Sequence, residues 1–405
     1  NHLRYPEAHP HSPWSMLELK RTPETNIFDM IREKDLLIHL PYESFDESVV
    51  NFLYSAANDK DVLAIKQTLY RVSSSSPVVQ ALEKAVQNGK QVTVLMEVKA
   101  RFDEANNILM ARRLEKAGAH VIYGLVGLKT HSKCTLVIRR EKDGIRRYVH
   151  VATGNYNAST AKLYTDLGIL TCSDRFGIDA SAFFNLLSGY SDPPIWDSFI
   201  VAPINLRQRC IELIDREIHF AKNGEDAHMI AKMNSLLDKG IIEKLYEASQ
   251  AGVKIELIVR GICVLIPGIP GASDNITVRS IVGRFLEHSR IFWFRNGGRE
   301  ELYISSADWM PRNLNDRVEL MVPIEDPEIK RRLKQMVDIE LSDNQKAHIM
   351  QADGTWLKTI SAENQLCAQE YFQKIAEKRD AEDEMTLAQK LEPYTPVLGH
   401  GDGSD

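Results

Sequence analysis

The sequence has few cysteines and no long apolar run, and both features narrow the classes of protein to which it can belong. The five cysteines are scattered and include no C-x-x-C pair, so neither a zinc site nor a disulfide framework is indicated. This cysteine usage is typical of a reducing cytoplasm. No stretch approaches the roughly eighteen apolar residues of a membrane span, and no secretory signal opens the chain. We therefore expect a cytoplasmic protein, and we leave peripheral contact with a membrane open.

An excess of positive charge is also absent. The formal net charge is −6, so the protein as a whole is not a general binder of polyanions, and phosphate chemistry would require a local basic cluster. The 405 residues are 43% hydrophobic and 26% charged, which is ordinary for a globular protein of two or three domains. The proline-rich segment 1–26 is typical of a linker or the end of an upstream domain. For residues 351–405 we expect a helix and a disordered tail.

Strand and helix patterns alternate in the first half of the chain. Strands are predicted over 62–70, 92–98 and 120–123, and helices over 77–89 and 107–116. A similar alternation begins again near residue 231. This β-α-β pattern predicts an α/β layered fold with a mostly parallel sheet. His120 and His150 fall in apolar strands, where we expect buried side chains.

One basic stretch leads into an apolar strand and contains the first candidate site. The segment GLKTHSK (127–133) runs directly into CTLVI (134–138). His131 and Lys133 are two residues apart, so on a strand they would project from the same face. A neutral imidazole is a nucleophile near pH 7 and lysine holds anionic oxygens, so the pair suits attack on a phosphate. An isolated H-x-K is more often a surface histidine beside a solvated lysine.

The spacing around this stretch recurs later in the chain. The interval from Gly89 to His131 is 42 residues, and the interval from Gly252 to His288 is 36. Each glycine closes a predicted helix, and each histidine starts one arm of a predicted hairpin. An internal duplication explains these intervals, and a pseudo-twofold axis would bring the two histidines to one shared cleft.

The ends of the two hairpins strengthen the case for a duplication. A small-residue turn follows each hairpin, with the sequence GNYN (154–157) in the first half and SSAD (305–308) in the second. Asp166 lies nine residues after the first turn, and Asp316 lies eight residues after the second. We therefore interpret the two aspartates as counterparts.

Two histidines across a duplicated α/β fold, each in an H-x-K or H-x-R pair, resemble the phospholipase D superfamily. In that chemistry one histidine attacks phosphorus to form a phosphohistidine, and the other protonates the leaving oxygen. The superfamily motif is H-x-K-x(4)-D, whose aspartate position here holds Ile138 in one half and Arg295 in the other, and Arg290 replaces the second lysine. These departures disfavour ordinary phosphodiester hydrolysis, and arginine favours a phosphate with several oxygens.

Longer stretches resemble one family more closely, the long-chain, ATP-dependent polyphosphate kinases of the two-histidine type. The resemblance covers about residues 27–345 and rests on DVLAIKQTLYR (61–71), EVKARFDEANNI (97–108), GLKTHSK (127–133), ATGNYNASTAKLYTDLGILT (152–171), LLDKGIIEKLYEASQAGVKIELIVRGICVLIPGIPGASDNI (236–276), RFLEHSRIFWFRNGG (284–298) and YISSADWMPRN (303–313). It implies two tandem phospholipase D-like α/β domains, 27–196 and 197–350, related by internal duplication. The family's N-terminal and head domains have no counterpart here, so the resemblance implies the catalytic portion alone.

The resemblance also implies roles for the residues around the histidines. His131 matches the family's autophosphorylated histidine. His288 matches a second histidine that contacts the nucleotide phosphates and protonates the leaving group. Lys129 and Lys133 flank His131 and are expected to hold phosphate oxygens, as Arg290 is expected to do beside His288.

Four further residues match ligand-binding positions of the family. Tyr164 and Arg260 match nucleotide-binding positions, and Arg71 and Arg101 match two positions assigned to a magnesium site. An arginine cation is a poor metal ligand, so we interpret Arg71 and Arg101 as clamps on phosphate oxygens beside Mg²⁺. The three arginines lie at or just after predicted strand ends, where α/β sites are usually built.

We therefore expect a phosphotransferase that moves the γ-phosphate of ATP to His131 and then to the end of an inorganic polyphosphate chain, reversibly. Mg²⁺ would accompany ATP or ADP, no nucleic acid partner is expected, and the resemblance implies a homodimer. Attack requires a neutral imidazole, so activity should fall below about pH 6.5 if His131 titrates normally. Two alternatives remain. A phospholipase D-type phosphodiesterase would hydrolyse its substrate without ATP, and a non-catalytic polyanion-binding module would tolerate His131→Ala.

Overall fold

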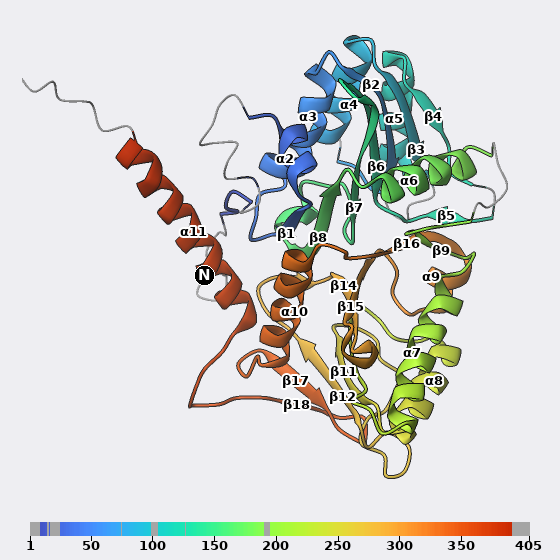
Figure 1. Ribbon diagram of the computed structural model, residues 1–405, viewed down its shortest axis with the longest axis vertical. Helices are drawn as coiled ribbons and strands as arrows, with labels where there is room; N and C mark the ends of the chain where they lie inside the picture. The colour runs from blue at the N-terminus through green and yellow to red at the C-terminus, as the bar shows by residue number, and fades with distance from the viewer. Residues whose placement is uncertain are drawn as a thin grey trace, which may run out of the picture.

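The computed structural model describes residues 9–13, 16, 25–73, 75–98, 104–125, 127–189 and 195–390. These residues form two lobes, each built around one sheet, and a long C-terminal helix extends away from both (Figure 1). The predicted α/β class and the predicted duplication are both confirmed by the arrangement of the strands.

The first sheet has the strand order β1-β8-β7-β6-β2-β3-β4. Its strands are β1 (Leu36–Leu40), β2 (Val62–Leu69), β3 (Gln91–Met96), β4 (His120–Ile122), β6 (Cys134–Glu141), β7 (Gly144–Ala152) and β8 (Tyr164–Thr171). Only the pairings of β3 with β2 and with β4 are parallel within this order; the other four are antiparallel. The prediction of a mostly parallel sheet is therefore wrong. The β-α-β pattern describes only half of the sheet, because the hairpin β6–β7 and strands β8 and β1 complete it in antiparallel fashion.

The second sheet repeats this order. Its strands are β9 (Ile200–Ala202), β10 (His228–Met233), β11 (Lys254–Val259), β12 (Ile276–Ile281), β14 (Arg290–Phe294), β15 (Glu301–Ser305), β16 (Arg317–Pro323), β17 (Ala347–Met350) and β18 (Trp356–Lys358). The order β16-β15-β14-β10-β11-β12 corresponds to β8-β7-β6-β2-β3-β4, and β9 pairs with β16 as β1 pairs with β8. Strands β17 and β18 extend this sheet beyond the repeat.

Helices cover the sheets, and the helices predicted over 77–89 and 107–116 are present with ends that differ by up to three residues. The helical segments are α2 (Ile27–Glu33), η2 (Asp46–Val50), α3 (Asn51–Asn58), α4 (Pro77–Gln87), α5 (Glu104–Ala117), η3 (Thr160–Lys162), α6 (Asp174–Leu187), α7 (Leu206–Lys222), α8 (Lys239–Gln250), η4 (Asn296–Gly298), α9 (Pro311–Asn315), α10 (Pro327–Leu341) and α11 (Ala368–Lys390). The Ser76 hydroxyl caps α4 by accepting an amide hydrogen bond at 3.3 Å, and Asp238 caps the equivalent helix α8 at 3.1 Å. Gly89 and Gly252 follow these two helices with φ values of 80° and 99°, which favour glycine.

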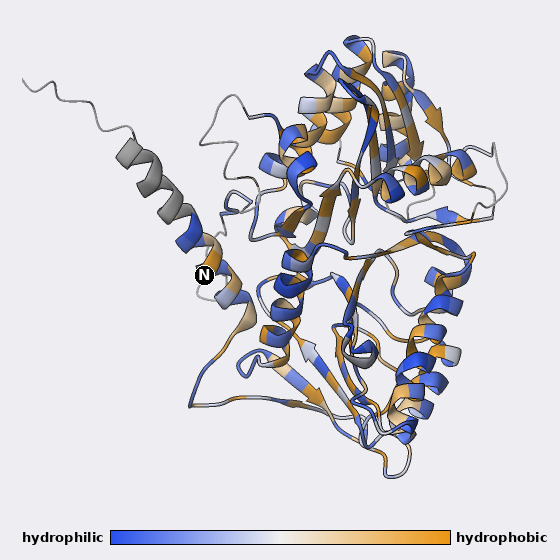
Figure 2. Cartoon of the chain, in the orientation of Figure 1, coloured by the Kyte–Doolittle hydropathy of each residue, from blue (hydrophilic) through white to orange (hydrophobic). Residues whose placement is uncertain are grey.

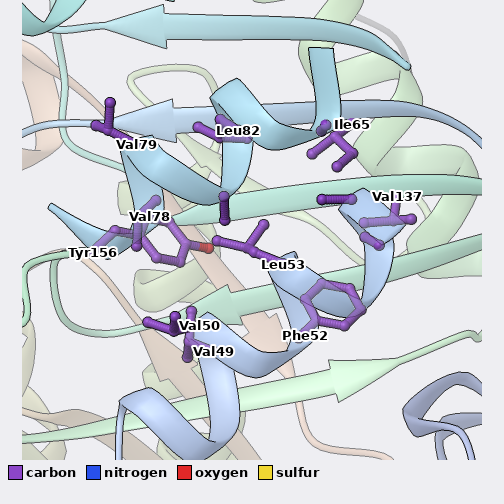
Figure 3. Close-up of a cluster of buried hydrophobic side chains, with 14 of the residues drawn as sticks. Val49, Val50, Phe52, Leu53, Ile65, Val78, Val79, Leu82, Val137 and Tyr156 are labelled. Carbon is purple, nitrogen blue, oxygen red and sulfur yellow. The ribbon is translucent and has the colours of Figure 1, made fainter. Parts of the chain in front are cut away.

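Apolar side chains hold the helices against the sheets. Hydrophobic residues gather on the strands and on the helix faces that meet them (Figure 2). In the first lobe, Phe52 and Leu53 of α3 and Leu82 of α4 are fully buried with Ile65 of β2 (Figure 3). Each such side chain contributes about 1.5–3 kcal/mol on burial. This packing fixes the strands, and with them the positions at which the loops at the strand ends begin.

Two short strands cross between the lobes. Strand β5 (Lys129–Thr130), which precedes His131, pairs in parallel with β16 of the second sheet. Strand β13 (Leu286–Glu287), which precedes His288, pairs in parallel with β8 of the first sheet. Each lobe therefore delivers its histidine onto a strand of the other lobe, at the boundary seen between β5 and β16 in Figure 1. In the described part of the chain, no helix is long and apolar enough to cross a membrane.

Candidate active site

His131 follows β5 and lies against a buried carboxylate of the other lobe. Its Nδ1 atom is 2.9 Å from both carboxylate oxygens of Glu319, the third residue of β16. Ser306 and Asn313 also donate hydrogen bonds to this fully buried carboxylate. Because an ionised carboxylate only accepts hydrogen bonds, a neutral His131 carries its proton on Nδ1 and presents the lone pair of Nε2.

His288 follows β13 and has a corresponding carboxylate in the first lobe. Its Nδ1 atom lies 2.8 Å and 3.0 Å from the two carboxylate oxygens of Asp166, which also accepts a hydrogen bond from Thr153 at 2.6 Å. A Cβ atom at Gly154 would lie 2.1 Å from Asp166 Oδ2, so the position requires glycine. Unlike His131, His288 has a cation on its outer nitrogen, because Nη1 of Arg290 lies 3.1 Å from Nε2.

The two carboxylates are exchanged between the lobes. His131 of the first lobe uses Glu319 of the second, and His288 of the second lobe uses Asp166 of the first. Asp166 and Glu319 are each the third residue of equivalent strands, β8 and β16. The interpretation of Asp316 as the counterpart of Asp166 is therefore wrong. Asp316 lies just before β16. The two turns are equally long, since 13 residues separate Thr153 from Asp166 and Ser306 from Glu319, so the error came from the alignment of the turns.

The small-residue turns also align differently from the prediction. The hydroxyls of Thr153 and Ser306 play the same part, since each accepts a backbone N–H at 3.0 Å from the residue that follows the site carboxylate. Gly154 is therefore equivalent to Ala307 and not to Ser305. The alignment by residue type alone was displaced by two positions.

Lys133 and Arg290 occupy equivalent positions but make different contacts. The buried ammonium of Lys133 turns back and donates to the carbonyl oxygen of His131. The prediction that the two side chains project from one face of a strand is wrong, because both residues lie in the connection between β5 and β6. Arg290 donates to both carboxylate oxygens of Asp308, at 3.1 Å and 3.0 Å, and to the carbonyl oxygen of His288 at 2.6 Å.

An aromatic ring that the sequence did not single out lies beside His131. The Tyr70 ring packs edge-on against the imidazole, with the ring centroids 4.7 Å apart. Three cations surround this ring: Arg71 and Lys133 each lie 5.7 Å from its centroid, and Arg317 lies 5.9 Å from it. The structure therefore places Arg71 with Lys133 beside His131 and adds Arg317 to the cluster.

The two predicted nucleotide contacts lie on the His288 side. The ring of Tyr164 is 5.2 Å from the imidazole of His288, centroid to centroid. Arg260 follows β11 and donates to the side-chain oxygen of Asn234 at 2.9 Å. The backbone N–H of Asn234 in turn donates to Asp308 at 2.7 Å, so Arg260 connects to the same carboxylate that holds Arg290.

The remaining predicted residues are those expected to hold phosphate oxygens or to lie at the magnesium site. Lys129 lies on β5, opposite Arg317 of β16. Arg101 lies outside the described residues. Among the residues that are described, no group of three or more histidine, cysteine, aspartate or glutamate side chains is arranged to hold a metal ion. The donor set around the histidines is cationic and therefore suits phosphate oxygens.

Burial and positive charge shift the ionisation of both histidines. Burial lowers the pKa of His131 well below its usual value of 6.5, and nearby cations lower it further: Lys133, Arg317, Arg290 and a charged His288. Burial also lowers the pKa of His288, assisted by Arg290 and opposed by Asp166. The pKa of Lys133 falls to about 7, chiefly through burial. The acid limit of pH 6.5 assumed normal titration of His131, so the structure moves that limit to lower pH.

The burial expected for His120 and His150 can also be compared with the structure. His150 is buried as expected, with its hydrogen-bonded ring inside the first sheet, whereas His120 on the short strand β4 is exposed. The prediction for His120 is wrong, because β4 is the outer strand of its sheet and pairs only with β3 among the described strands.

Family models match the chain in two successive parts. Residues 26–193 match the polyphosphate kinase C-terminal domain 1, and residues 199–369 match the polyphosphate kinase C-terminal domain 2. The chain belongs to the polyphosphate kinase family.

Individual relatives agree with this assignment. A polyphosphate kinase of Halalkalibacterium halodurans is 60% identical over 324 residues, which are 80% of this chain and 46% of the relative. The chain therefore spans about half the length of the curated polyphosphate kinases it matches. The crystal structure of polyphosphate kinase from Porphyromonas gingivalis has a TM-score of 0.85 and 38% identity, over 94% of this chain and 57% of that one. Phosphatidylserine synthase from Haemophilus influenzae shares the fold, with a TM-score of 0.51 at 13% identity, over 86% of this chain and 94% of that one.

The structure brings several groups to the site that were not predicted from the sequence. Glu319 and Tyr70 were given no role, and Asp166 was noted only for its interval. A signal for Glu319 did exist. It is an acidic residue within the otherwise apolar run VELMV of β16, and a buried carboxylate requires partners. Tyr70 had no comparable signal, because a tyrosine at a strand end is ordinary.

Proposed function

We propose that the chain carries the phosphotransfer site of a polyphosphate kinase, with His131 as the phosphate carrier. The observation that carries this proposal is the environment of the imidazole. Its Nδ1–H is directed at the buried Glu319 carboxylate, its pKa is lowered by burial and nearby cations, and Nε2 makes no hydrogen bond to the described residues. A neutral, oriented imidazole beside three cations is suited to attack an anionic phosphorus.

The first half-reaction can be written on these atoms. The Nε2 lone pair of His131 forms a bond to the γ-phosphorus of ATP, the bond from that phosphorus to the bridging oxygen breaks, and ADP leaves with the electron pair. The imidazole ring gains positive charge as the N–P bond forms. Glu319, at 2.9 Å from Nδ1, balances that charge and needs no rearrangement to do so.

The second half-reaction returns the ring to its starting state. A terminal phosphate oxygen of polyphosphate attacks the phosphorus, the N–P bond breaks, and its electron pair returns to Nε2 of His131. In the first half-reaction, His288 would contact the nucleotide phosphates and, as an imidazolium that has taken a proton from solvent on Nε2, pass that proton to the leaving oxygen. Arg290 Nη1, which now lies 3.1 Å from Nε2, would turn to a phosphate oxygen in that state. Each step is reversible, so the same groups would form ATP from polyphosphate and ADP.

The cations would hold the substrates. Lys129, Lys133 and Arg71 lie on the His131 side, and Tyr164 and Arg260 would contact the nucleotide on the other side. Mg²⁺ would arrive as part of the MgATP substrate, neutralising phosphate oxygens, while Arg71 and Arg101 clamp other oxygens of the same phosphates. The donor chemistry favours this arrangement, since guanidinium groups match phosphate geometry and do not ligate cations.

The proposal extends to the organisation and location of the protein. The two catalytic units would comprise residues 27–196 and 197–350, each with its own sheet, and would complete each other's sites through β5 and β13. ATP, ADP and inorganic polyphosphate are the proposed substrates, and a homodimer is the proposed assembly. All five cysteines are unpaired, as is usual in a reducing cytoplasm.

The test is labelling with γ-³²P-ATP and Mg²⁺. Wild type should acquire an acid-labile, base-stable label, as expected of a phosphohistidine, and His131→Ala should acquire none. His120→Ala is the matched control, because His120 is an exposed histidine of the first lobe outside the site, and it should label like wild type. Label retained by His131→Ala, or hydrolysis of a phosphodiester by unlabelled wild type without ATP, would contradict the proposal.

A further inference from the structure

A buried ionic cluster lies directly behind His288. The ammonium of Lys232, on the central strand β10, is 2.6 Å from Glu287 Oε2 and also donates to Glu340 at the end of α10. All three side chains are almost completely buried. Burial raises the pKa of Glu340, while Lys232 and two further hydrogen-bond donors, Gln369 and Thr165, keep the pKa of Glu287 low, so Glu287 is the charged partner. The proposed phosphotransfer uses none of these groups.

Glu287 connects this cluster to the His288 backbone. The hydroxyl of Thr165, on β8, donates to Glu287 Oε2 at 2.9 Å and accepts the backbone N–H of His288 at 3.1 Å. Thr165 is also the neighbour of Asp166, whose carboxylate orients the imidazole of His288. The cluster therefore fixes the backbone of His288 and the strand that carries its carboxylate at the same point.

The C-terminal helix α11 contacts Glu287 and the segment before it through its second residue, Gln369. The Gln369 side chain accepts the N–H of Phe285 and donates to the carbonyl oxygen of the same residue, both at 2.9 Å. It also donates to Glu287 Oε1 at 2.6 Å. Gly283 permits the contact, because a Cβ atom there would lie 2.4 Å from the Gln369 side chain. Gln369 thus holds the whole segment that leads to His288.

The segment before His131 is anchored differently. The N–H of Thr130, which is equivalent to Glu287, donates to Glu97 at 2.9 Å, and Glu97 belongs to the first lobe itself. The side chain that anchors Thr130 is thus supplied by the loop after β3 and not by α11. The connection between the C-terminal helix and a site histidine is therefore particular to His288.

We propose that Gln369, Glu287 and Lys232 are positioning residues for His288, through which the first turn of α11 holds the imidazole against Asp166. They do not touch the reacting atoms. Loss of the Gln369 contacts would free the segment 283–287 and let the imidazole move away from the nucleotide phosphates. A displacement of about 1 Å at a reacting group costs roughly 100-fold in rate. The consequence for activity rests on the proposed function, whereas the consequence for the orientation of His288 does not.

The test replaces Gln369 by leucine, which has a similar size and cannot form the three hydrogen bonds. Gln373→Leu is the matched control, because Gln373 lies one turn along the same helix and its side-chain hydrogen bonds go to His11 and Glu377. The first readout is the imidazole Nδ1–H resonance of His288 in ¹⁵N-histidine-labelled protein, assigned by its loss in His288→Ala. We expect that resonance to shift or broaden in Gln369→Leu while the His131 resonance stays in place, and to stay unchanged in Gln373→Leu.

The second readout is the rate of phosphate transfer. Gln369→Leu should lower kcat by about 10-fold to 100-fold, with a rise in the KM for ATP, because His288 is proposed to contact the nucleotide. Glu287→Gln, which keeps the shape of the side chain, should change the same resonance and serves if the leucine variant does not fold. An unchanged His288 resonance in both variants would overturn the inference. A changed resonance in a protein without kinase activity would support it and contradict the proposed function instead.

Discussion

The two halves of the site share one backbone frame and differ in what occupies the outer nitrogen of each histidine. Both imidazoles direct Nδ1 at a buried carboxylate supplied by the opposite lobe. At His288 a guanidinium, that of Arg290, lies on Nε2, while at His131 the corresponding Lys133 is directed at a backbone oxygen instead. Both halves therefore share the carboxylate that orients the imidazole. Because Arg290 stands where the first half has Lys133, only His131 has an Nε2 lone pair without a cation on it.

The largest expected difference between the two halves comes from replacing the carboxylate beside each histidine. Glu319→Gln removes the charge that is proposed to balance a phosphohistidine at His131, and the amide can hold the ring in the wrong tautomer. We expect transfer to fall by roughly 10³- to 10⁴-fold, as when the orienting carboxylate of a catalytic histidine becomes an amide. Asp166→Asn acts on His288, the proposed acid, so the loss should be smaller, about 10²-fold. Single-turnover labelling with γ-³²P-ATP measures both rates.

A buried glutamate outside the site controls for the cost of the amide itself. Glu217 on α7 is as fully buried as Glu319 and accepts backbone N–H groups of Asn296 and His228. Glu217→Gln should change thermal stability without changing the labelling rate per folded molecule. Equal losses for Glu319→Gln and Asp166→Asn would show that the two halves are not specialised as described.

The sequence predicted the elements that recur in both halves of the chain. It did not predict the strands and side chains through which each lobe contacts the other. The duplication, the two histidines and the capped helices α4 and α8 follow from local patterns, since glycine, proline and capping residues act within a few positions. The exchange of β5 and β13 between the lobes has no local signal, because a two-residue strand cannot be distinguished from a loop. The pairing of Glu319 and Asp166 with the histidines could not be predicted for the same reason, although a carboxylate within the apolar run VELMV did mark Glu319 as a buried group that requires partners.

The two cations give a second and finer comparison, through pH. Burial lowers the pKa of Lys133 to about 7, so its ammonium loses its proton, and with it the proposed hold on phosphate, as the pH rises through 7. The pKa of His131 is already well below 6.5, so the proposed nucleophile remains neutral across this range. We therefore expect kcat/KM for ATP to fall on the alkaline side with a midpoint near pH 7, and to fall on the acid side only below pH 6.5.

Replacing each cation by the type found in the other half should change kcat/KM in different ways. Lys133→Arg keeps its charge at every accessible pH, so the alkaline limb should move above pH 9, as expected for a guanidinium. Arg290→Lys loses the paired hydrogen bonds to Asp308 and the contact to His288, and should lower kcat/KM about tenfold or more, since a charged hydrogen bond contributes about 1.5–3 kcal/mol. An alkaline limb that is the same in wild type and Lys133→Arg would assign that limb to another group.

The smallest expected effect concerns how each half anchors its turn. In the first half, the Tyr156 hydroxyl lies 2.9 Å from Thr135 Oγ1 and 2.8 Å from His150 Nδ1, inside the core drawn in Figure 3. In the second half, Trp309 occupies the equivalent position and stacks on Phe292 with the rings 4.8 Å apart and nearly parallel. One turn is therefore held by hydrogen bonds and the other by apolar contact.

Tyr156→Phe should consequently destabilise the protein without altering the phosphotransfer chemistry. It leaves Nδ1 of His150 without its partner in a position where burial lowers the pKa of the ring to about 3, so the ring cannot gain a proton as compensation. The free energy of unfolding in urea should fall by about 1–3 kcal/mol, the usual cost of a buried polar group without a partner. Tyr54→Phe is the control, because this partly buried tyrosine packs on the same core and its hydroxyl makes no hydrogen bond within the described residues. If both variants lose the same stability, the hydrogen bonds of Tyr156 contribute nothing, and the first turn is held by packing just as the second one is.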